Sequence, residues 1–213
     1  MLDPDTEHAT QLHNHWYWRP GHRPDRPFYT WHLTFDGQHD LHRLVTEYHQ
    51  AIRDLPGLDV VPIPWLHITM QGIGFADEVS DTDRDAIIAA ASQRLATIPP
   101  PTLTFHHITI RPEAITLYPN PTEPVRTIRA EIRRAIADVW GINHVPDAAD
   151  TYQPHLSIAY VNSHAEASRI VDLSSGKNPD PARVVITFAS CVAQQRLNHS
   201  YQWDTRAAAH FAG

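Results

Sequence analysis

Cysteine is nearly absent from this sequence. Cys191 is the single cysteine in 213 residues, and it lies within the apolar run VVITFASCVA. A disulfide bond within the chain is therefore excluded, and so is a zinc site built on cysteine thiolates. The apolar surroundings predict that Cys191 is a buried thiol of the core.

The chain also has few charged residues, and it has fewer basic than acidic ones. Charged residues make up 19% of the chain, and 24 acidic residues outnumber 17 lysines and arginines, which gives a net charge of −7 with neutral histidine. A firm grip on long nucleic acid needs a broad basic surface. We therefore expect no binding to DNA, while a nucleotide or an RNA end would need only a local positive pocket.

Long hydrophobic runs and the commonest catalytic loops are missing too. No apolar segment reaches the roughly 18 residues that a membrane span requires. The acidic, histidine-rich N-terminus has no hydrophobic signal core. These features predict a cytoplasmic protein that does not enter a membrane. Neither a Gly-rich phosphate loop nor a G-x-S-x-G elbow occurs, so catalysis of those kinds is not indicated.

What is present is a core-forming pattern that alternates between strand and helix periods, which predicts an α+β fold. Residues 1–27, rich in Pro, His, Asp and Arg, are expected to form an arm draped over the protein through Trp16, Tyr17 and Trp18. Residues 28–213 are expected to form a single bilobal domain, with two antiparallel sheets facing a central cleft and helices outside. We predict helices over 38–54, 82–97, 123–140 and 163–173. We predict strands over 28–35, 59–75, 102–110, 113–118, 152–161, 183–193 and, returning through Asn198-His199, 194–206.

Two of the predicted strands carry the same triplet, His-x-[Thr/Ser], in an alternating apolar run. In WLHITMQGIGF, His67 stands two residues before Thr69, and in YQPHLSIAYVN, His155 stands two residues before Ser157. Side chains at i and i+2 of a strand point to one face, so each strand presents an imidazole beside a hydroxyl. Two such strands brought together would suit acid–base chemistry on a phosphate.

Alternation assigns the neighbours of the triplets to faces. The expected polar faces hold Trp65, His67, Thr69 and Gln71 in the first strand, and Gln153, His155, Ser157 and Ala159 in the second. The expected apolar faces hold Leu66, Ile68 and Met70, and Leu156, Ile158 and Tyr160. Further candidate substrate contacts are His32, Trp65, Gln71, Tyr160 and Arg196. Arg129, Arg133 and Arg134 on the long helix are interpreted as a solvated face.

The segments HITM (67–70) and HLSI (155–158) resemble the paired H-x-[T/S]-x motifs of the two-histidine (2H) phosphoesterase superfamily, which includes the bacterial RNA 2′,3′-cyclic phosphodiesterases, also called 2′-5′ RNA ligases. The fourth position is apolar in both copies, and QGIG follows the first. The resemblance covers about residues 28–206. It implies a pseudo-symmetric bilobal fold and metal-independent catalysis, with His67 and His155 as the catalytic histidines and Thr69 and Ser157 contacting the phosphate. The basic residue that often follows the second motif in the bacterial enzymes is replaced here by Ala159-Tyr160.

The resemblance implies hydrolysis of a 2′,3′-cyclic phosphate, on an RNA 3′ end or a small nucleotide, to a phosphomonoester, without a cofactor. An imidazole with an ordinary pKa near ~6.5 can serve as acid or base, so one neutral and one protonated histidine give a bell-shaped pH–rate profile. The resemblance favours His155 as base and His67 as acid. Three alternatives stay open: a non-catalytic nucleotide or RNA-end binding module, a 2′-5′ RNA ligase, and a histidine–metal hydrolase using the pairs His13/His15 or His39/His42. We expect a monomer.

Overall fold

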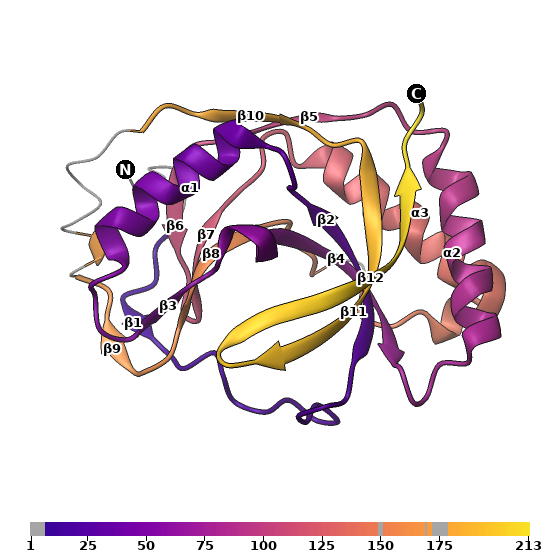
Figure 1. Ribbon diagram of the computed structural model, residues 1–213, viewed down its shortest axis with the longest axis horizontal. Coiled ribbons are helices and arrows are strands. Elements are labelled where there is room, and N and C mark those ends of the chain that lie inside the picture. The colour runs from indigo at the N-terminus through magenta and orange to yellow at the C-terminus, as the bar shows by residue number, and fades with distance from the viewer. Residues whose placement is uncertain (1–6, 149–150, 169, 172–178) are drawn as a thin grey trace.

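Two four-stranded antiparallel sheets form the body of the protein, in a computed structural model that describes residues 7–148, 151–168, 170–171 and 179–213 (Figure 1). The predicted α+β class is confirmed. The first sheet has the order β12 (Ser200–His210), β11 (Phe188–Leu197), β2 (Phe28–Thr34) and β4 (His67–Phe75). The second has the order β3 (Leu58–Val60), β8 (Leu156–Val161), β7 (Ala114–Leu117) and β6 (Ile108–Ile110). Two short pairs complete the strands, β10 (Ala182–Val185) with β5 (Thr102–Phe105) and β1 (Gln11–Leu12) with β9 (Ala165–Glu166).

Three long helices lie outside the sheets, close to their predicted bounds: α1 (His39–Ile52), α2 (Asp81–Leu95) and α3 (Glu123–Trp140). Ser80 caps α2, because its hydroxyl accepts a hydrogen bond from the Asp83 backbone N–H. Gly141 ends α3 with a φ of +83°, a conformation that glycine adopts without steric cost. The described residues also contain two short 3₁₀ helices, η1 (Ile63–Trp65) before β4 and η2 (Ile142–His144) after α3.

Each lobe is covered by a helix from the other half of the chain. Helix α1 leaves the first sheet after β2, yet Tyr48 donates to the His106 carbonyl (2.8 Å) and His49 to the Ile158 carbonyl (2.8 Å) of the second lobe. Helix α3 leaves the second sheet after β7, yet Arg129 Nε donates to the Met70 carbonyl of β4 (2.8 Å). These hydrogen bonds connect the two lobes. They also hold the two triplet strands, because α3 bonds to β4 and α1 bonds to β8.

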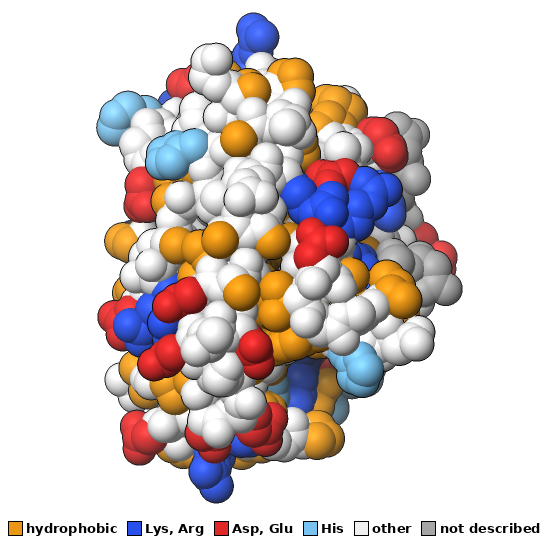
Figure 2. Space-filling model, turned by 90° about the vertical axis from the view of Figure 1, so that its right-hand side faces the viewer, with side chains coloured by type: hydrophobic (Ala, Val, Ile, Leu, Met, Phe, Trp, Pro, Cys, Tyr) orange, Lys and Arg blue, Asp and Glu red, His pale blue; other side chains and the backbone are white. Residues whose placement is uncertain are grey.

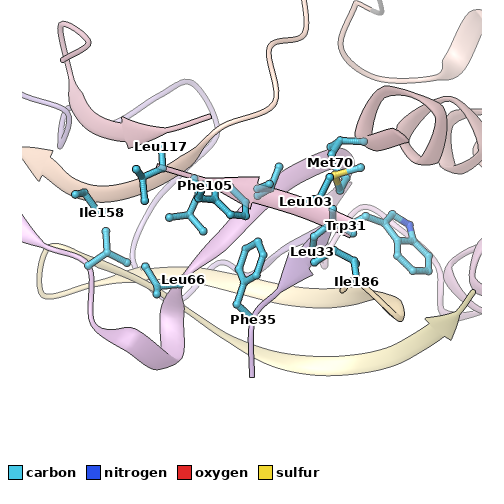
Figure 3. Close-up of a cluster of buried hydrophobic side chains, with 14 of the residues drawn as sticks. Trp31, Leu33, Phe35, Leu66, Met70, Leu103, Phe105, Leu117, Ile158 and Ile186 are labelled. Carbon is cyan, nitrogen blue, oxygen red and sulfur yellow. The ribbon is translucent and has the colours of Figure 1, made fainter. Parts of the chain in front are cut away.

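The core runs continuously between the lobes. Figure 3 shows side chains of both sheets and of β5 meeting in one cluster, among them Trp31, Leu33, Leu66, Phe105, Leu117 and Ile158. The predicted apolar face of the first triplet strand is buried, with Leu66 and Ile68 at most 1% exposed, and Trp31 and Leu33 of β2 are buried beside it. Cys191 is fully buried, as predicted. Burial of this set stabilises the mutual position of the two sheets.

Several predicted strands are interrupted. The strand expected over 59–75 is split by η1, and the one over 152–161 begins only at Leu156. The strand over 102–110 is broken at His106-His107, so that β5 pairs with β10 and β6 with β7. The strand over 183–193 is broken between β10 and β11. In the three strands that are split, the pairing partner changes along the segment, which is a tertiary event that β-propensity does not reveal.

The hairpin predicted at Asn198-His199 is confirmed. Both residues have positive φ values, +48° and +54°, as a two-residue turn between β11 and β12 requires. In the segment predicted as a helix over 163–173, residues 165–166 instead form β9. Residues 168, 170 and 171 are helical, as predicted, and residues 169 and 172–173 lie outside the described part of the chain.

No helix in the described residues is long and apolar enough to cross a membrane. The face formed by α2 and α3 carries arginine and acidic side chains side by side (Figure 2). Arg94, for example, is paired with both Glu131 and Asp138. This face therefore lacks the broad basic patch that a long nucleic acid would require.

Candidate functional site

Both triplet strands carry a β-bulge at the same place. Thr69 pairs with His32 and Gln71 with Trp31, so Met70 has no partner on β2. Ser157 pairs with Thr116 and Ala159 with Ile115, so Ile158 has no partner on β7. The bulge thus falls on the apolar fourth residue of each motif, and such an insertion re-aims the side chains that follow. The two motifs are structurally equivalent down to this irregularity.

The two histidines are anchored identically. His67 Nδ1 lies 2.9 Å from the carbonyl oxygen of Trp65, and His155 Nδ1 lies 2.8 Å from that of Gln153. Since a carbonyl only accepts, each Nδ1 carries the proton and donates it two residues back. The Nε2 atom of each ring is then an unprotonated acceptor. This fixed tautomer orients a basic nitrogen in each motif.

All four triplet residues line one cavity of about 810 Å³, namely His67, Thr69, His155 and Ser157. The volume lies within the range of small-molecule sites. The two imidazoles also interact electrostatically, because the charge of His155 contributes to lowering the pKa of His67. The sequence prediction that two residues 88 positions apart converge on one cleft is therefore met by the geometry.

Burial keeps both imidazoles neutral in the unliganded site. Desolvation lowers the pKa of His67 to about 4, and the same effect lowers the pKa of His155. His67 is 7% exposed and His155 is half-buried. An anion bound between the rings would favour their charged forms and raise these pKa values again. The arrangement can therefore take up a proton when a phosphate is present.

The hydroxyls differ in their surroundings. Thr69 is exposed to the cavity, whereas Ser157 is buried and lies next to the Tyr160 side chain. Tyr160 was expected on the apolar face with Leu156 and Ile158. That face assignment is wrong, because the bulge at Ile158 turns Tyr160 to the side of Ser157 and into the cavity lining. Its inclusion among candidate substrate contacts agrees with this position.

Two other predicted contacts, His32 and Trp65, do not line the cavity and instead lie behind His67. His32 is fully buried, its ring centroid is 4.3 Å from that of His67, and its Nε2 lies 2.7 Å from Gln194 Oε1. The Trp65 ring packs edge-on against Trp203 at 4.9 Å, and its backbone carbonyl holds His67. Both residues therefore support the orientation of His67 rather than reach a ligand.

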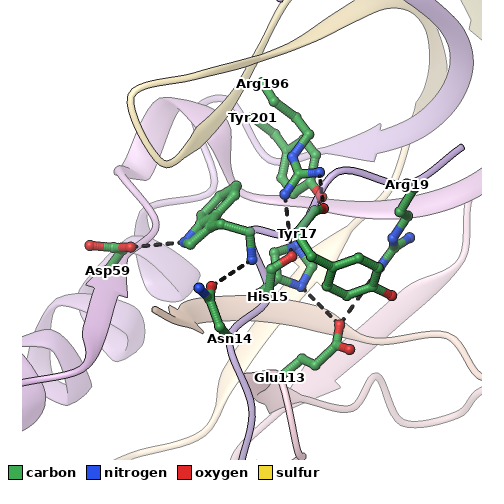
Figure 4. Close-up of polar contacts among 9 residues, drawn as sticks. Asn14, His15, Tyr17, Arg19, Asp59, Glu113, Arg196 and Tyr201 are labelled. Atoms are coloured by element: carbon green, nitrogen blue, oxygen red, sulfur yellow. Dashed lines mark hydrogen bonds and ion pairs between the residues drawn. The ribbon is translucent and has the colours of Figure 1, made fainter. Parts of the chain in front are cut away.

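Gln71 and Arg196 line the cavity, but their polar groups are engaged by the protein. Gln71 Nε2 donates to the Pro146 carbonyl (2.7 Å), and its Oε1 accepts from Arg133 (2.9 Å). Arg196 donates to the backbone carbonyls of Tyr17 (2.8 Å) and His15 (3.2 Å), fastening the N-terminal arm to β11 (Figure 4).

The interpretation of Arg129 as part of a solvated face is wrong. Its side chain is buried, it donates to the carbonyls of Met70 and Ala148, and its guanidinium lies 4.3 Å from the Tyr152 ring centroid. The sequence held a signal for this, because Arg129 stands four residues after Val125 and three before Ile132, on the buried stripe of α3. Arg134 is exposed as predicted.

Other lining residues were not predicted from the sequence to contact a substrate, although His15 was considered as a metal ligand. Arg111 precedes β7 and donates to Gln153 Oε1 at 3.2 Å, next to the loop that holds His155. His15 and Arg19 come from the arm and share Glu113, whose Oε2 lies 3.2 Å from His15 Nδ1 and 3.7 Å from Arg19. Nothing local marks them, since only the folded arm brings them to the cavity. Among the described residues, no three histidine, cysteine, aspartate or glutamate side chains are grouped as a metal ion would require.

A family model described as the 2′-5′ RNA ligase superfamily matches residues 41–196. The chain belongs to the 2′-5′ RNA ligase superfamily. The resemblance to two-histidine phosphoesterases is confirmed, and enzymes of this superfamily are phosphoesterases and ligases. A search of curated proteins finds no significant match.

Solved structures of this superfamily's fold agree with the bilobal architecture. The chain is similar to TT0787 of Thermus thermophilus, with a TM-score of 0.66 and 14% identity over 88% of this chain and 98% of that one. It is similar to Escherichia coli LigT in complex with 3′-AMP, with a TM-score of 0.63 and 13% identity over 88% and 99% of the two chains. A structure described as a phosphoesterase gives a TM-score of 0.63 and 14% identity over 88% and 99%. At these identities the likeness establishes the fold.

Proposed function

We propose that this member of the 2′-5′ RNA ligase superfamily hydrolyses 2′,3′-cyclic phosphates to phosphomonoesters by two-histidine acid–base catalysis. The observation that carries the proposal is the matched pair of imidazoles, His67 and His155, each with Nδ1–H tied to the carbonyl two residues earlier and both lining one cavity. Structures of LigT complexed with 3′-AMP and with phosphate lend support, since both ligands carry a phosphate monoester or anion of the kind the reaction releases.

The proposed step balances protons between the two rings. One unprotonated imidazole takes a proton from water as the water oxygen attacks phosphorus. The other imidazole, protonated when the anionic substrate is bound, gives its proton to the ribose oxygen as the bond from that oxygen to phosphorus breaks. The two rings have then exchanged protonation states, and proton exchange with solvent restores them. Each proton transfer is typically worth about 10²–10⁴-fold in rate.

Thr69 and Ser157 would donate hydrogen bonds to the non-bridging phosphate oxygens. Both residues line the cavity in which the phosphate would bind, where such donors act more strongly as charge builds up on the phosphate. A hydroxyl adds no charge, so it does not disturb the balance between the two imidazoles. Arginines outnumber acidic residues in the cavity lining, which suits a phosphate ligand. Among the described lining residues the arginines are Arg19, Arg111, Arg129 and Arg196, and the acids are Glu113 and Asp147.

The test is hydrolysis of 2′,3′-cyclic nucleotides by the purified protein with a chelator present. We expect turnover by the wild type, and a fall of about 10²-fold or more in kcat for His67→Ala and for His155→Ala. His39→Ala is the matched control, because His39 is exposed on α1 and does not line the cavity.

Other outcomes identify the alternatives. Binding of a cyclic nucleotide without hydrolysis by the wild type would assign a non-catalytic binding module. Activity abolished by the chelator and restored by a divalent metal would assign a metal hydrolase. Joined RNA products formed from cyclic phosphate and 5′-hydroxyl ends would assign a ligase.

A further inference from the structure

The N-terminal arm is fastened to the protein at several points beside the cavity. His13 and His15 donate backbone hydrogen bonds to the carbonyls of Pro112 (2.7 Å), between β6 and β7, and Val161 (2.8 Å), the last residue of β8. Trp16 Nε1 donates to Asp59 Oδ2 at 2.8 Å. Figure 4 shows the contact with Asp59 together with Arg196, which also binds the arm. The arm is therefore built into this end of the cleft.

The anchored arm forms part of the cavity wall. His15 stacks on Tyr160 with ring centroids 4.3 Å apart and hydrogen-bonds to the Tyr201 hydroxyl at 2.8 Å, and Tyr160 in turn contacts Ser157. Arg19 and His22 of the same segment also line the cavity. This wall lies outside residues 41–196, the part of the chain that the superfamily model matches.

Two large aromatic side chains on this segment remain uncovered. Tyr17 is 52% exposed and Trp18 is 51% exposed, although the arm was expected to pack through them and the neighbouring Trp16 does so. The Arg196 guanidinium, which lines the cavity, lies 5.1 Å from the centroid of the Trp18 ring. A half-exposed indole beside a cationic cavity is an arrangement on which nucleobases stack.

A cation stands next to the exposed rings. Arg19 is 47% exposed at its side chain, and its ion pair with Glu113 is long, at 3.7 Å, because Glu113 is shared with His15. A guanidinium held so loosely can turn to a phosphate and bind it through two parallel hydrogen bonds. An exposed aromatic ring for a base and a cation for a phosphate, side by side, are the two elements that single-stranded nucleic-acid sites combine.

We propose that residues 15–22 form a subsite for the nucleotide that precedes the terminal cyclic phosphate of an RNA, with Trp18 stacking on its base and Arg19 contacting its phosphate. The preferred substrate is then an RNA 3′ end rather than a mononucleotide. This inference rests on the proposed function, and it adds the substrate class and the residues that recognise it.

The experiment compares two substrates, 2′,3′-cyclic AMP and a trinucleotide ending in a 2′,3′-cyclic phosphate. We expect the wild type to have the higher kcat/KM for the trinucleotide. Trp18→Ala should lower the ratio of the two kcat/KM values by about 5- to 150-fold, the usual effect of losing one stacked base. Arg19→Gln should lower the same ratio and reduce the salt dependence of trinucleotide KM by about one counterion.

Two control variants change the same kinds of side chain away from the cavity. Arg23→Ala removes an exposed arginine of the arm that is paired with Asp77 at 3.8 Å. Ile142→Ala removes a 69% exposed hydrophobic side chain on η2. Both should leave the substrate ratio unchanged. Equal kcat/KM for the two substrates in the wild type, or a ratio that Trp18→Ala does not alter, would overturn the subsite while leaving the proposed hydrolysis intact.

A binding measurement separates the subsite from the chemistry. If neither substrate is hydrolysed, the proposed function fails, and the anisotropy of a labelled trinucleotide ending in a 3′-phosphate then tests the arm directly. Weaker binding by Trp18→Ala than by Ile142→Ala supports the subsite. Equal binding, or self-association of the wild type that Trp18→Ala abolishes, refutes it and assigns the exposed rings to contact between copies.

Discussion

Arg129 and His49 perform the same task on opposite sides of the cleft. Arg129 of α3 donates to the carbonyl of the bulge residue Met70, and His49 of α1 donates to the carbonyl of the bulge residue Ile158, both at 2.8 Å. The Ile158 carbonyl also accepts from the Val61 backbone N–H at 2.8 Å, so His49 is a second donor to it. A buried carbonyl needs a donor, and Arg129 supplies one to Met70. Two helices of opposite halves thus hold the two irregular points that set the geometry of the candidate catalytic strands.

Replacing Arg129 by a residue without a hydrogen-bond donor should destabilise the bulge at Met70. For Arg129→Met we expect a loss of about 1–3 kcal/mol in the free energy of unfolding, because the Met70 and Ala148 carbonyls lose a buried donor. We also expect a lower kcat, because Thr69 directly precedes the bulge. Urea unfolding and steady-state kinetics measure both. Arg134→Met, an exposed change on the same helix, should stay within about 0.5 kcal/mol. Equal stability of the two variants would contradict the assigned role.

The cavity hydroxyls should contribute to the transition state. Thr69→Val and Ser157→Ala remove a donor with little change of shape, and each should lower kcat about 10- to 150-fold, the usual value of a hydrogen bond to a charged group. Thr205→Val, exposed on β12, is the matched control. Steady-state rates with 2′,3′-cyclic nucleotides provide the measurement. An effect confined to KM would show that the hydroxyls bind substrate and transition state equally.

The pH–rate profile of hydrolysis should have its maximum in kcat/KM at acidic pH. Because burial lowers the pKa of His67 to about 4 and also that of His155 below its ordinary value, the singly protonated pair is most populated below about pH 6.5. We expect both limbs of the kcat/KM bell below that pH. In kcat the basic limb should move to higher pH, because bound phosphate stabilises the imidazolium. A kcat/KM that still rises above neutral pH would contradict this protonation scheme.

Buried histidines should also make stability depend on pH. Burial lowers the pKa of His15 to about 3, that of His67 to about 4, and that of His32 far below its ordinary value. Below about pH 6.5 the unfolded chain binds protons that the folded protein does not, so the free energy of unfolding falls as pH falls. Each such histidine contributes a slope of about 1.4 kcal/mol per pH unit.

The variant His32→Leu isolates one of these contributions. Between roughly pH 4.5 and 6.5, it should reduce the slope of the unfolding free energy against pH by about 1.4 kcal/mol per pH unit, the contribution of one histidine. This holds whatever the effect of the substitution on absolute stability. Urea unfolding at a series of pH values measures the slope. His39→Leu, at an exposed position of α1, is the matched control. An unchanged slope in His32→Leu would show that His32 binds its proton in the folded state as readily as in the unfolded chain.

The sequence by itself determined the secondary-structure classes and the candidate pairs His67/Thr69 and His155/Ser157. The reason is local: side chains at i and i+2 share a face for as long as a strand stays regular, and both pairs end just before a bulge. The period of two fails beyond that point, and this is why the face of Tyr160 was misassigned.

Tertiary structure decided everything that depends on long-range contacts. It placed Arg129 under β4, it set His32 and Trp65 behind His67 instead of in the cavity, and it laid His15 and Arg19 of the arm along the cavity wall. A sequence records the polarity of each side chain, but whether a polar side chain meets water, a bulge carbonyl or a ligand depends on which distant strand, helix or arm folds against it.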